Sequence, residues 1–191
     1  LRRRSSDISA LLMAKIIESL LKKFCSDCDV FLIKSIQNRY ILDDNRYSNK
    51  KGDLTILNGS KLWEDLRSTF NSIDYKKTII IDCHSFYKGG FSEKDSTEVV
   101  ILDYDPYQSL SKELIKSIPN SELHTGKIGS NSIMDIFRLH PHSVPVILLE
   151  VKEDIVHQKL YEIGIHIKNV LISYIKYIRN KDKYMDINSK N

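Results

Sequence analysis

The feature that most constrains this chain is the alternation of apolar segments that follow two different periods. Apolar side chains recur at helical spacing within residues 8–24, 110–118 and 156–178. Between these segments lie short runs, notably residues 78–82 and 144–151, that are apolar on both faces, as strands inside a parallel sheet are. The pattern predicts an α/β fold with a mostly parallel central sheet and helices on both faces.

Weaker patterns add further elements to this architecture. We expect additional strands at residues 29–33, 39–43 and 98–102, and a further helix at residues 60–73. Ser6 or Asp7 is available to cap the first helix. No internal repeat or low-complexity linker interrupts the chain, so we expect one domain over residues 1–180 and a polar, frayed tail at residues 181–191. A chain of 191 residues with 41% hydrophobic content suits one domain with a buried core.

Charge and hydropathy exclude some classes of partner. The 29 basic and 25 acidic residues give a net charge of +4, but the signs are interleaved, and the only tight basic cluster lies at residues 2–4. Nucleic-acid-binding proteins concentrate basic residues on a stripe with aromatic side chains between them, so we do not expect a nucleic-acid partner. No run approaches the roughly 20 apolar residues of a membrane helix, so no membrane span is expected.

The three cysteines do not describe a disulfide framework. Cys25 and Cys28 have redox-motif spacing, but no second pair completes a structural zinc site. We expect both to be reduced thiols at a junction between a helix and a strand. This cysteine usage favours an intracellular, cytoplasmic location.

Polar residues follow three of the predicted strands, where an apolar core would not place them. One strand runs into residues 43–46, one into residues 82–85, and one ends at Glu150. Ligands of open α/β sheets bind beyond the carboxyl ends of the strands, so these residues are candidates for a site. The first group could instead form surface ion pairs, and His84 could be an ordinary loop histidine. Glu150 follows an apolar run, and a carboxylate at a buried edge requires a partner, which favours a functional role.

The same segments resemble those of the N-formylglutamate amidohydrolase-like family. Residues 38–46, Asn-Arg-Tyr-Ile-Leu-Asp-Asp-Asn-Arg, are similar to the family's S-R-[YF]-hydrophobic-hydrophobic-D-x-N-R segment. Residues 81–86, Ile-Asp-Cys-His-Ser-Phe, resemble its hydrophobic-D-x-H-S strand end. Residues 146–151, Val-Ile-Leu-Leu-Glu-Val, resemble its late, glutamate-bearing strand. Order and spacing agree, and the resemblance covers most of the chain.

The resemblance implies a zinc-exopeptidase or phosphorylase/hydrolase-like fold, similar to that of zinc carboxypeptidases and deacylases. In such proteins a zinc ion at the carboxyl edge of the sheet activates water against an amide or formyl carbon. His84 would be a metal ligand, and Glu150 would be the general base. Arg39, Asn45 and Arg46 would hold the carboxylate of the substrate. The implied function is that of a zinc-dependent amidohydrolase acting on a small carboxylate-bearing amide.

The chain departs from the family pattern at one point. The family's first metal motif, a Pro-His-Gly/Ala-type strand end, should precede the first helix, where this chain begins. We therefore expect residues 1–180 to lack the family's first strand. The candidate additional ligands are Asp7, Glu150, His124, His140 and His142, and none has the usual spacing. The His-x-His pair at 140 and 142 can chelate a metal or can belong to a surface loop. An alternative function therefore stays open, that of a catalytically degenerate family member acting as a binding or structural component of an assembly with a protein partner.

Two expectations about placement follow. Arg39, Arg46, His84 and Glu150 should lie around one cleft, within roughly 12 Å of one another, the scale of a small-ligand pocket. The strands at residues 78–82 and 146–150 should be neighbours near the centre of the sheet.

Overall fold

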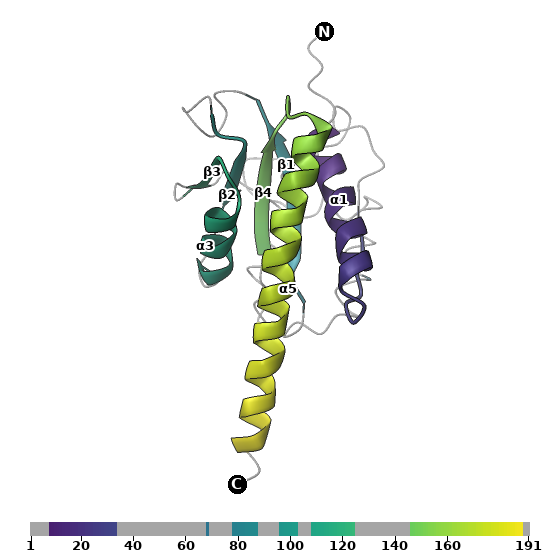
Figure 1. Cartoon of the computed structure of the whole chain (residues 1–191), viewed down its shortest axis with the longest axis vertical. Coiled ribbons are helices and arrows are strands. Elements are labelled where there is room, and N and C mark those ends of the chain that lie inside the picture. The colour runs from purple at the N-terminus through teal and green to yellow at the C-terminus, as the bar shows by residue number, and fades with distance from the viewer. Residues whose placement is uncertain are drawn as a thin grey trace, which may run out of the picture.

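A computed structural model describes the greater part of the chain. The described residues are 8–33, 68, 78–87, 96–102, 108–124 and 146–188, with side chains described as far as residue 180. The elements are α1 (Ile8–Phe24), β1 (Ile80–Phe86), β2 (Val99–Leu102), α3 (Gln108–Ser117), β3 (Ser121–His124), β4 (Val146–Lys152) and α5 (His157–Asn188). Figure 1 shows their arrangement, with α1 and α5 side by side across the sheet.

The strands form a mixed sheet in the order β1-β4-β2-β3. β1 pairs with β4 in parallel, and β2 pairs with β3 in parallel, but β2 and β4 run antiparallel to each other. The α/β class is therefore confirmed, while the chain reverses its strand direction in the middle of the sheet. The expected pairing of the strands near residues 80 and 148 is confirmed as well. β4 lies inside the sheet, whereas β1 and β3 are the two edge strands among the described strands, so the expected central position is confirmed for β4 and not for β1.

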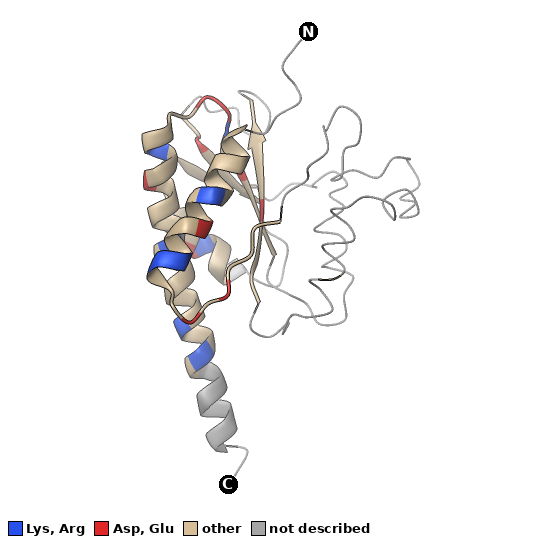
Figure 2. Ribbon diagram, turned by 90° about the vertical axis from the view of Figure 1, so that its right-hand side faces the viewer, with Lys and Arg blue, Asp and Glu red and all other residues tan. Residues whose placement is uncertain are grey.

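One face of this sheet carries the helices. α1, α3 and α5 all lie on the same side of it, as Figure 2 shows edge-on. Their apolar side chains, among them Met13, Leu114 and Leu160, pack against every second residue of the strands. The strand residues in this core are Val99, Ile101, Ile147, Leu149 and Val151, with Ile81, Cys83 and Leu123 packed at its margin. Within the described segments the helices cover this face, and these segments do not test the expected helical cover of the other face.

The first helix begins against a distant turn. The Ile8 amide donates a hydrogen bond of 3.2 Å to Oε1 of Glu153, and the Ser9 hydroxyl donates to the Glu153 carbonyl at 2.8 Å. A carboxylate is favourable here because the amino end of a helix carries a partial positive charge. The Glu153 amide in turn donates to the Phe86 carbonyl at 2.9 Å. One residue after β4 thus joins the start of α1 to the end of β1. The caps proposed from the sequence, Ser6 and Asp7, lie outside the described residues.

Three sequence predictions about regular structure are corrected. Residues 29–33 form no regular strand, and Phe31 is 74% exposed, so this apolar run does not enter the sheet. Conversely, β3 was not predicted, although a turn at Asn120, with φ of 54°, leads directly into it. Residues 181–188, expected to be a frayed tail, continue α5 as helix. The strand expected at 39–43 and most of the helix expected at 60–73 lie outside the described residues.

The prediction for the cysteine pair is also corrected. Cys25 and Cys28 are joined by a disulfide across the turn that follows α1, with Cα atoms 5.5 Å apart. They are therefore not the reduced thiols that the sequence led us to expect. Cys83 is a free cysteine. As for membrane spans, none of the described helices, including the 32-residue α5, combines the length and apolarity that crossing a bilayer requires.

Close contact between α1 and α5 depends on Gly164. A Cβ atom at this position would overlap Cγ2 of Ile16 and would lie 3.4 Å from Cδ1 of Leu20. The absence of a side chain lets the two helices approach at the centre of the core. Glycine weakens a helix by about 1 kcal/mol relative to alanine, so close packing is the physical reason for its presence in α5.

We predict that Gly164→Ala destabilises the protein by about 1–3 kcal/mol, because overpacking at the helix contact outweighs the gain in helix propensity. Equilibrium urea unfolding measures this change. Asn169→Ala, at an exposed position of the same helix, is the matched control and should be neutral or slightly stabilising. Ile16→Leu removes the Cγ2 branch, so the cost of Gly164→Ala should shrink in that background. A stabilised Gly164→Ala protein would contradict this account of the helix contact.

Candidate functional site

The face opposite the helices carries the polar residues that the sequence singled out. Side chains alternate along a strand, and Cys83 and Leu149 point into the helix-covered core. Their neighbours His84 and Glu150 therefore point to the other face. These two residues are direct partners in the parallel register of β1 and β4. Neighbouring strands lie about 4.8 Å apart, so the pairing holds the imidazole and the carboxylate side by side.

Asp82 joins this pair through His84. Its Oδ1 lies 3.0 Å from Nε2 of His84, and the two side chains are only 9% and 12% exposed. Residues i and i+2 of a strand point to the same face, which places the carboxylate beside the ring. A carboxylate in this position fixes the orientation of an imidazole. Asp82, His84 and Glu150, here called the carboxylate–histidine cluster, form the candidate site.

Glu150 is held in a largely water-free position. Its residue is 6% exposed, between His84 on β1 and Val100 on β2, and Val100 is itself fully buried. Burial of a carboxylate is costly unless charged or polar groups compensate for the lost water. An apolar residue would suit this position better if it served packing alone. The burial therefore supports the reading of Glu150 as a functional residue.

Cys83 does not belong to the cluster, although it precedes His84 in the sequence. Its thiol points to the helix-covered face and packs at the margin of the core. Burial raises the pKa of this thiol far above its usual range, and the negative charge of Asp82 adds to the effect. A cysteine nucleophile acts as the thiolate, so the Cys-His dipeptide here is not a catalytic pair.

One more carboxylate and one more imidazole lie on the same face of the sheet but far from His84. Glu122 and His124 on β3 are in register with Val100 and Leu102 of β2. His124 is therefore three strands away from β1, or about 14 Å. Zinc ligands sit about 2 Å from the metal, so His124 and His84 cannot share one ion. Glu122 accepts a hydrogen bond of 2.8 Å from the Thr97 hydroxyl.

The described residues do not complete a zinc site. Asp82 and His84 supply donor atoms of the kinds that zinc binds, but a catalytic zinc takes about three protein ligands. Within the described segments no three His, Cys, Asp or Glu side chains are grouped closely enough to hold a metal. In addition, Nε2 of His84 already faces Asp82. The other candidates, namely Asp7, Arg39, Asn45, Arg46, His140 and His142, lie outside the described residues.

A surface hollow of about 340 Å³ lies away from the cluster, near the start of α5. It is lined by Glu98, Lys152, Asp154, Ile155, Val156 and Lys159. An ion pair between Lys159 and Glu98 crosses it. Neither His84 nor Glu150 lines this hollow, so it is not the cleft expected from the sequence.

Comparison with known proteins supports the fold alone. The structure of gene product Atu2144 from Agrobacterium tumefaciens is similar, with a TM-score of 0.50 over 89% of this chain and 79% of that chain. The two sequences are 14% identical. No family model matches the chain, and no curated protein matches it. At this identity the similarity concerns the fold and carries no assignment of function.

We predict that Cys83 reacts slowly with iodoacetamide in the native protein at pH 8, and rapidly once the chain is unfolded in guanidinium. Each unit by which the pKa of a thiol is raised lowers the fraction present as thiolate about tenfold. The labelling rate of native Cys83 should therefore be at least about 100-fold below that of the unfolded chain. Mass spectrometry of the labelled peptide measures both rates. Cys83→Ala shows any labelling due to Cys25 and Cys28. Rapid labelling of native Cys83 would contradict its burial.

Proposed function

We propose that the chain has the phosphorylase/hydrolase-like fold of the N-formylglutamate amidohydrolase-like family and hydrolyses a small carboxylate-bearing amide. The observation that carries this proposal is the side-by-side placement of His84 and Glu150 on the face opposite the helices, with Asp82 against the ring. The segments that supply these residues are those in which the sequence resembles the family. Arg39, Asn45 and Arg46 are proposed to bind the carboxylate of the substrate.

In this proposal Glu150 is the general base. Its carboxylate takes a proton from water as the water oxygen attacks the amide carbon. The same proton then passes to the departing nitrogen when the C–N bond breaks. Because burial removes competing water from Glu150, the carboxylate can bind and orient the attacking water. Asp82 orients His84, which is proposed to stabilise the negative charge that develops on the amide oxygen.

Zinc is implied by the family resemblance, where it would polarise the amide oxygen and the attacking water. The described donors are too few for it, so no step here is assigned to the metal. His84 and Asp82 alone would hold an ion weakly, because each protein ligand that is lacking must be replaced by water.

We predict that the purified 191-residue chain holds zinc far below one ion per chain. Elemental analysis after dialysis against zinc-containing buffer measures the content, and His84→Ala is the matched comparison, expected to give the same low value. Near-stoichiometric zinc that is lost on His84→Ala would contradict the prediction and would establish His84 as a ligand.

A second function is favoured by the same scarcity of donors in the described segments. The fold could serve as a binding or structural component of an assembly, with the carboxylate–histidine cluster retained for binding. Titration calorimetry with N-acyl amino acids distinguishes the two functions. Binding without turnover supports the binding component, and turnover supports the amidohydrolase.

We predict that Glu150→Gln lowers kcat/KM for hydrolysis of N-formyl and N-acyl amino acids by about 100-fold or more, because the general base is lost. The substitution keeps the shape of the side chain, so KM should change little. Glu122→Gln, on the same face but two strands from β4, is the control and should keep its activity within about twofold. Amine release measures the rate, and thermal melting verifies the fold of each variant. A wild-type chain without turnover on the panel refutes the enzyme, and unimpaired Glu150→Gln refutes the role of Glu150.

A further inference from the structure

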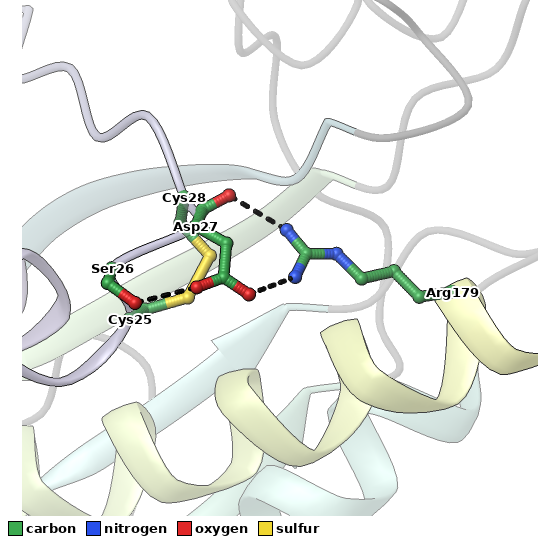
Figure 3. A network of polar contacts seen from close by, with 5 residues as sticks. All are labelled: Cys25, Ser26, Asp27, Cys28 and Arg179. Atoms are coloured by element: carbon green, nitrogen blue, oxygen red, sulfur yellow. Dashed lines mark hydrogen bonds and ion pairs between the residues drawn. A yellow bond between two sulfur atoms is a disulfide. The ribbon is translucent and has the colours of Figure 1, made fainter.

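The turn that follows α1 is closed in two ways. The Cys25 amide donates to the Leu21 carbonyl at 2.8 Å and so prolongs the helical hydrogen bonding, and the Cys28 amide donates to the Cys25 carbonyl at 3.2 Å. The disulfide between Cys25 and Cys28 then links the two ends of the turn (Figure 3). Both cysteines are partly exposed, and the two residues between them are exposed.

The guanidinium of Arg179, on α5, donates hydrogen bonds to both the side chain and the backbone of Asp27 in this turn. One guanidinium nitrogen, NH1, donates to Oδ2 of Asp27 at 2.9 Å, and the other, NH2, donates to the Asp27 carbonyl at 2.8 Å (Figure 3). The Ser26 hydroxyl donates to Oδ1 of Asp27 at 2.6 Å. The Ser26 hydrogen bond and the guanidinium hold the pKa of Asp27 below its usual range, so the carboxylate is ionised at neutral pH. We call these contacts the Asp27–Arg179 clamp.

The clamp attaches the part of α5 that extends beyond the core. Leu171 is the last fully buried residue of this helix, and Tyr174 is the last that packs against the core cluster. In Figure 1 the helix continues past the end of the sheet toward the C-terminus. Among the described side chains of α5 beyond Tyr174, Arg179 is the one that makes polar contacts with another element.

We propose that the Cys25–Cys28 pair is a reversible thiol–disulfide site, and that its reduction by a dithiol releases the Asp27–Arg179 clamp and loosens the outer part of α5. A thiolate of the dithiol attacks one sulfur and forms a mixed disulfide, and the other cysteine leaves as a thiolate that takes up a proton. The second thiol of the reductant then closes its own disulfide. Cys25 and Cys28 together gain two electrons and two protons, and the dithiol loses them.

The link from sulfur to helix is the carbonyl of Asp27. Arginine needs this main-chain acceptor and the carboxylate at fixed relative positions, because its donors form a rigid planar fork. The disulfide restricts the backbone of the turn that presents both acceptors. After reduction the hydrogen bonds from Cys28 to Cys25 and from Ser26 to Asp27 remain within the turn, but no covalent link fixes its two ends, and the two acceptors no longer keep one geometry.

The position of the pair makes it a substrate for a dithiol rather than an oxidoreductase centre. Catalytic Cys-x-x-Cys pairs lower the pKa of a thiol at the amino end of a helix. This pair follows the carboxyl end of α1, whose partial negative charge disfavours a thiolate, and the carboxylate of Asp27 lies between the two cysteines. Cys83 does not interfere, because it is partly buried and packs at the margin of the core in a different part of the fold.

Hydrogen exchange of the whole chain, with and without dithiothreitol, tests the proposal. Reduction should speed amide exchange in residues 175–188 about two- to fivefold, the range expected for loss of an exposed ion pair, while residues 157–171 stay unchanged. Intact mass measured after alkylation verifies that both thiols have formed. Unchanged exchange in the fully reduced wild type would overturn the proposal.

Variants separate the clamp from the disulfide itself. Arg179→Ala with the disulfide intact should exchange as fast as the reduced wild type, and dithiothreitol should add nothing further. Arg179→Lys, which keeps the charge but loses the fork, should show most of the same increase. The double variant Cys25→Ser/Cys28→Ser should exchange as fast as the reduced wild type. If this variant does not fold, the comparison of the wild type with Arg179→Ala still decides the proposal. An Arg179→Ala protein that responds to dithiothreitol as the wild type does would also overturn the proposal.

Discussion

The parallel pairing of β1 with β4 determines both the core and the candidate site. Each residue of one strand has a fixed partner on the other, and the side chains alternate between the two faces. Because Cys83 and Leu149 face the helices, His84 and Glu150 must face away from them. A slip of one residue in β4 would turn Glu150 toward the helix-covered face and would place a carboxylate in an apolar core. The burial of apolar residues on one face therefore specifies the register that brings the polar residues together on the other.

The two faces of this sheet have different chemical requirements. On the helix side, side chains interlock closely enough that Gly164 has no room for a methyl group beside Ile16. On the other side, Asp82 and His84 are nearly buried yet remain polar, and they make their contact with each other. A buried polar contact of this kind adds little net stability, because the desolvation of both groups offsets their attraction. Its presence on a well-packed sheet is therefore better explained by binding or chemistry than by stability.

The apolar pattern of the sequence was sufficient to predict helices and strands where one spacing of apolar residues persisted over a long segment. The ends of α1 follow from the apolar residues between Ile8 and Phe24, and the strand ending near Glu150 follows from its unbroken apolar run. The pattern failed for short segments, since β3 reads Ser-Glu-Leu-His and carries a single apolar residue. It failed in the opposite sense at residues 29–33, where an apolar run has no neighbouring strand to pair with among the described residues. Strand direction could be predicted only in part, because strands that are apolar on both faces predict a parallel sheet, yet β4 has the antiparallel β2 as one of its neighbours.

The candidate site could be predicted in part for the same reasons. His84 and Glu150 stood out because polar residues ended apolar strands, and alternation alone could have assigned Asp82 to the face of His84 and Cys83 to the opposite one. The sequence could not distinguish bonded cysteines from thiols, because the spacing of Cys25 and Cys28 permits both. Contacts between distant segments, such as that of Asp27 with Arg179, leave no local pattern at all.

The hydrogen bond that the Ile8 amide, at the start of α1, donates to Glu153 has a consequence for how the chain folds. The two partners are separated by 145 positions, and the apolar face of α1 packs on α5, close to the end of the chain. Ribosomes release the amino end first, so α1 leaves the tunnel long before the turn that caps it and the helix that covers it exist. Contacts of such long sequence separation slow folding, because the intervening chain must be closed into a loop before they form. The core is completed only after synthesis of α5, and until then the apolar face of α1 is exposed to chaperones and to other nascent chains.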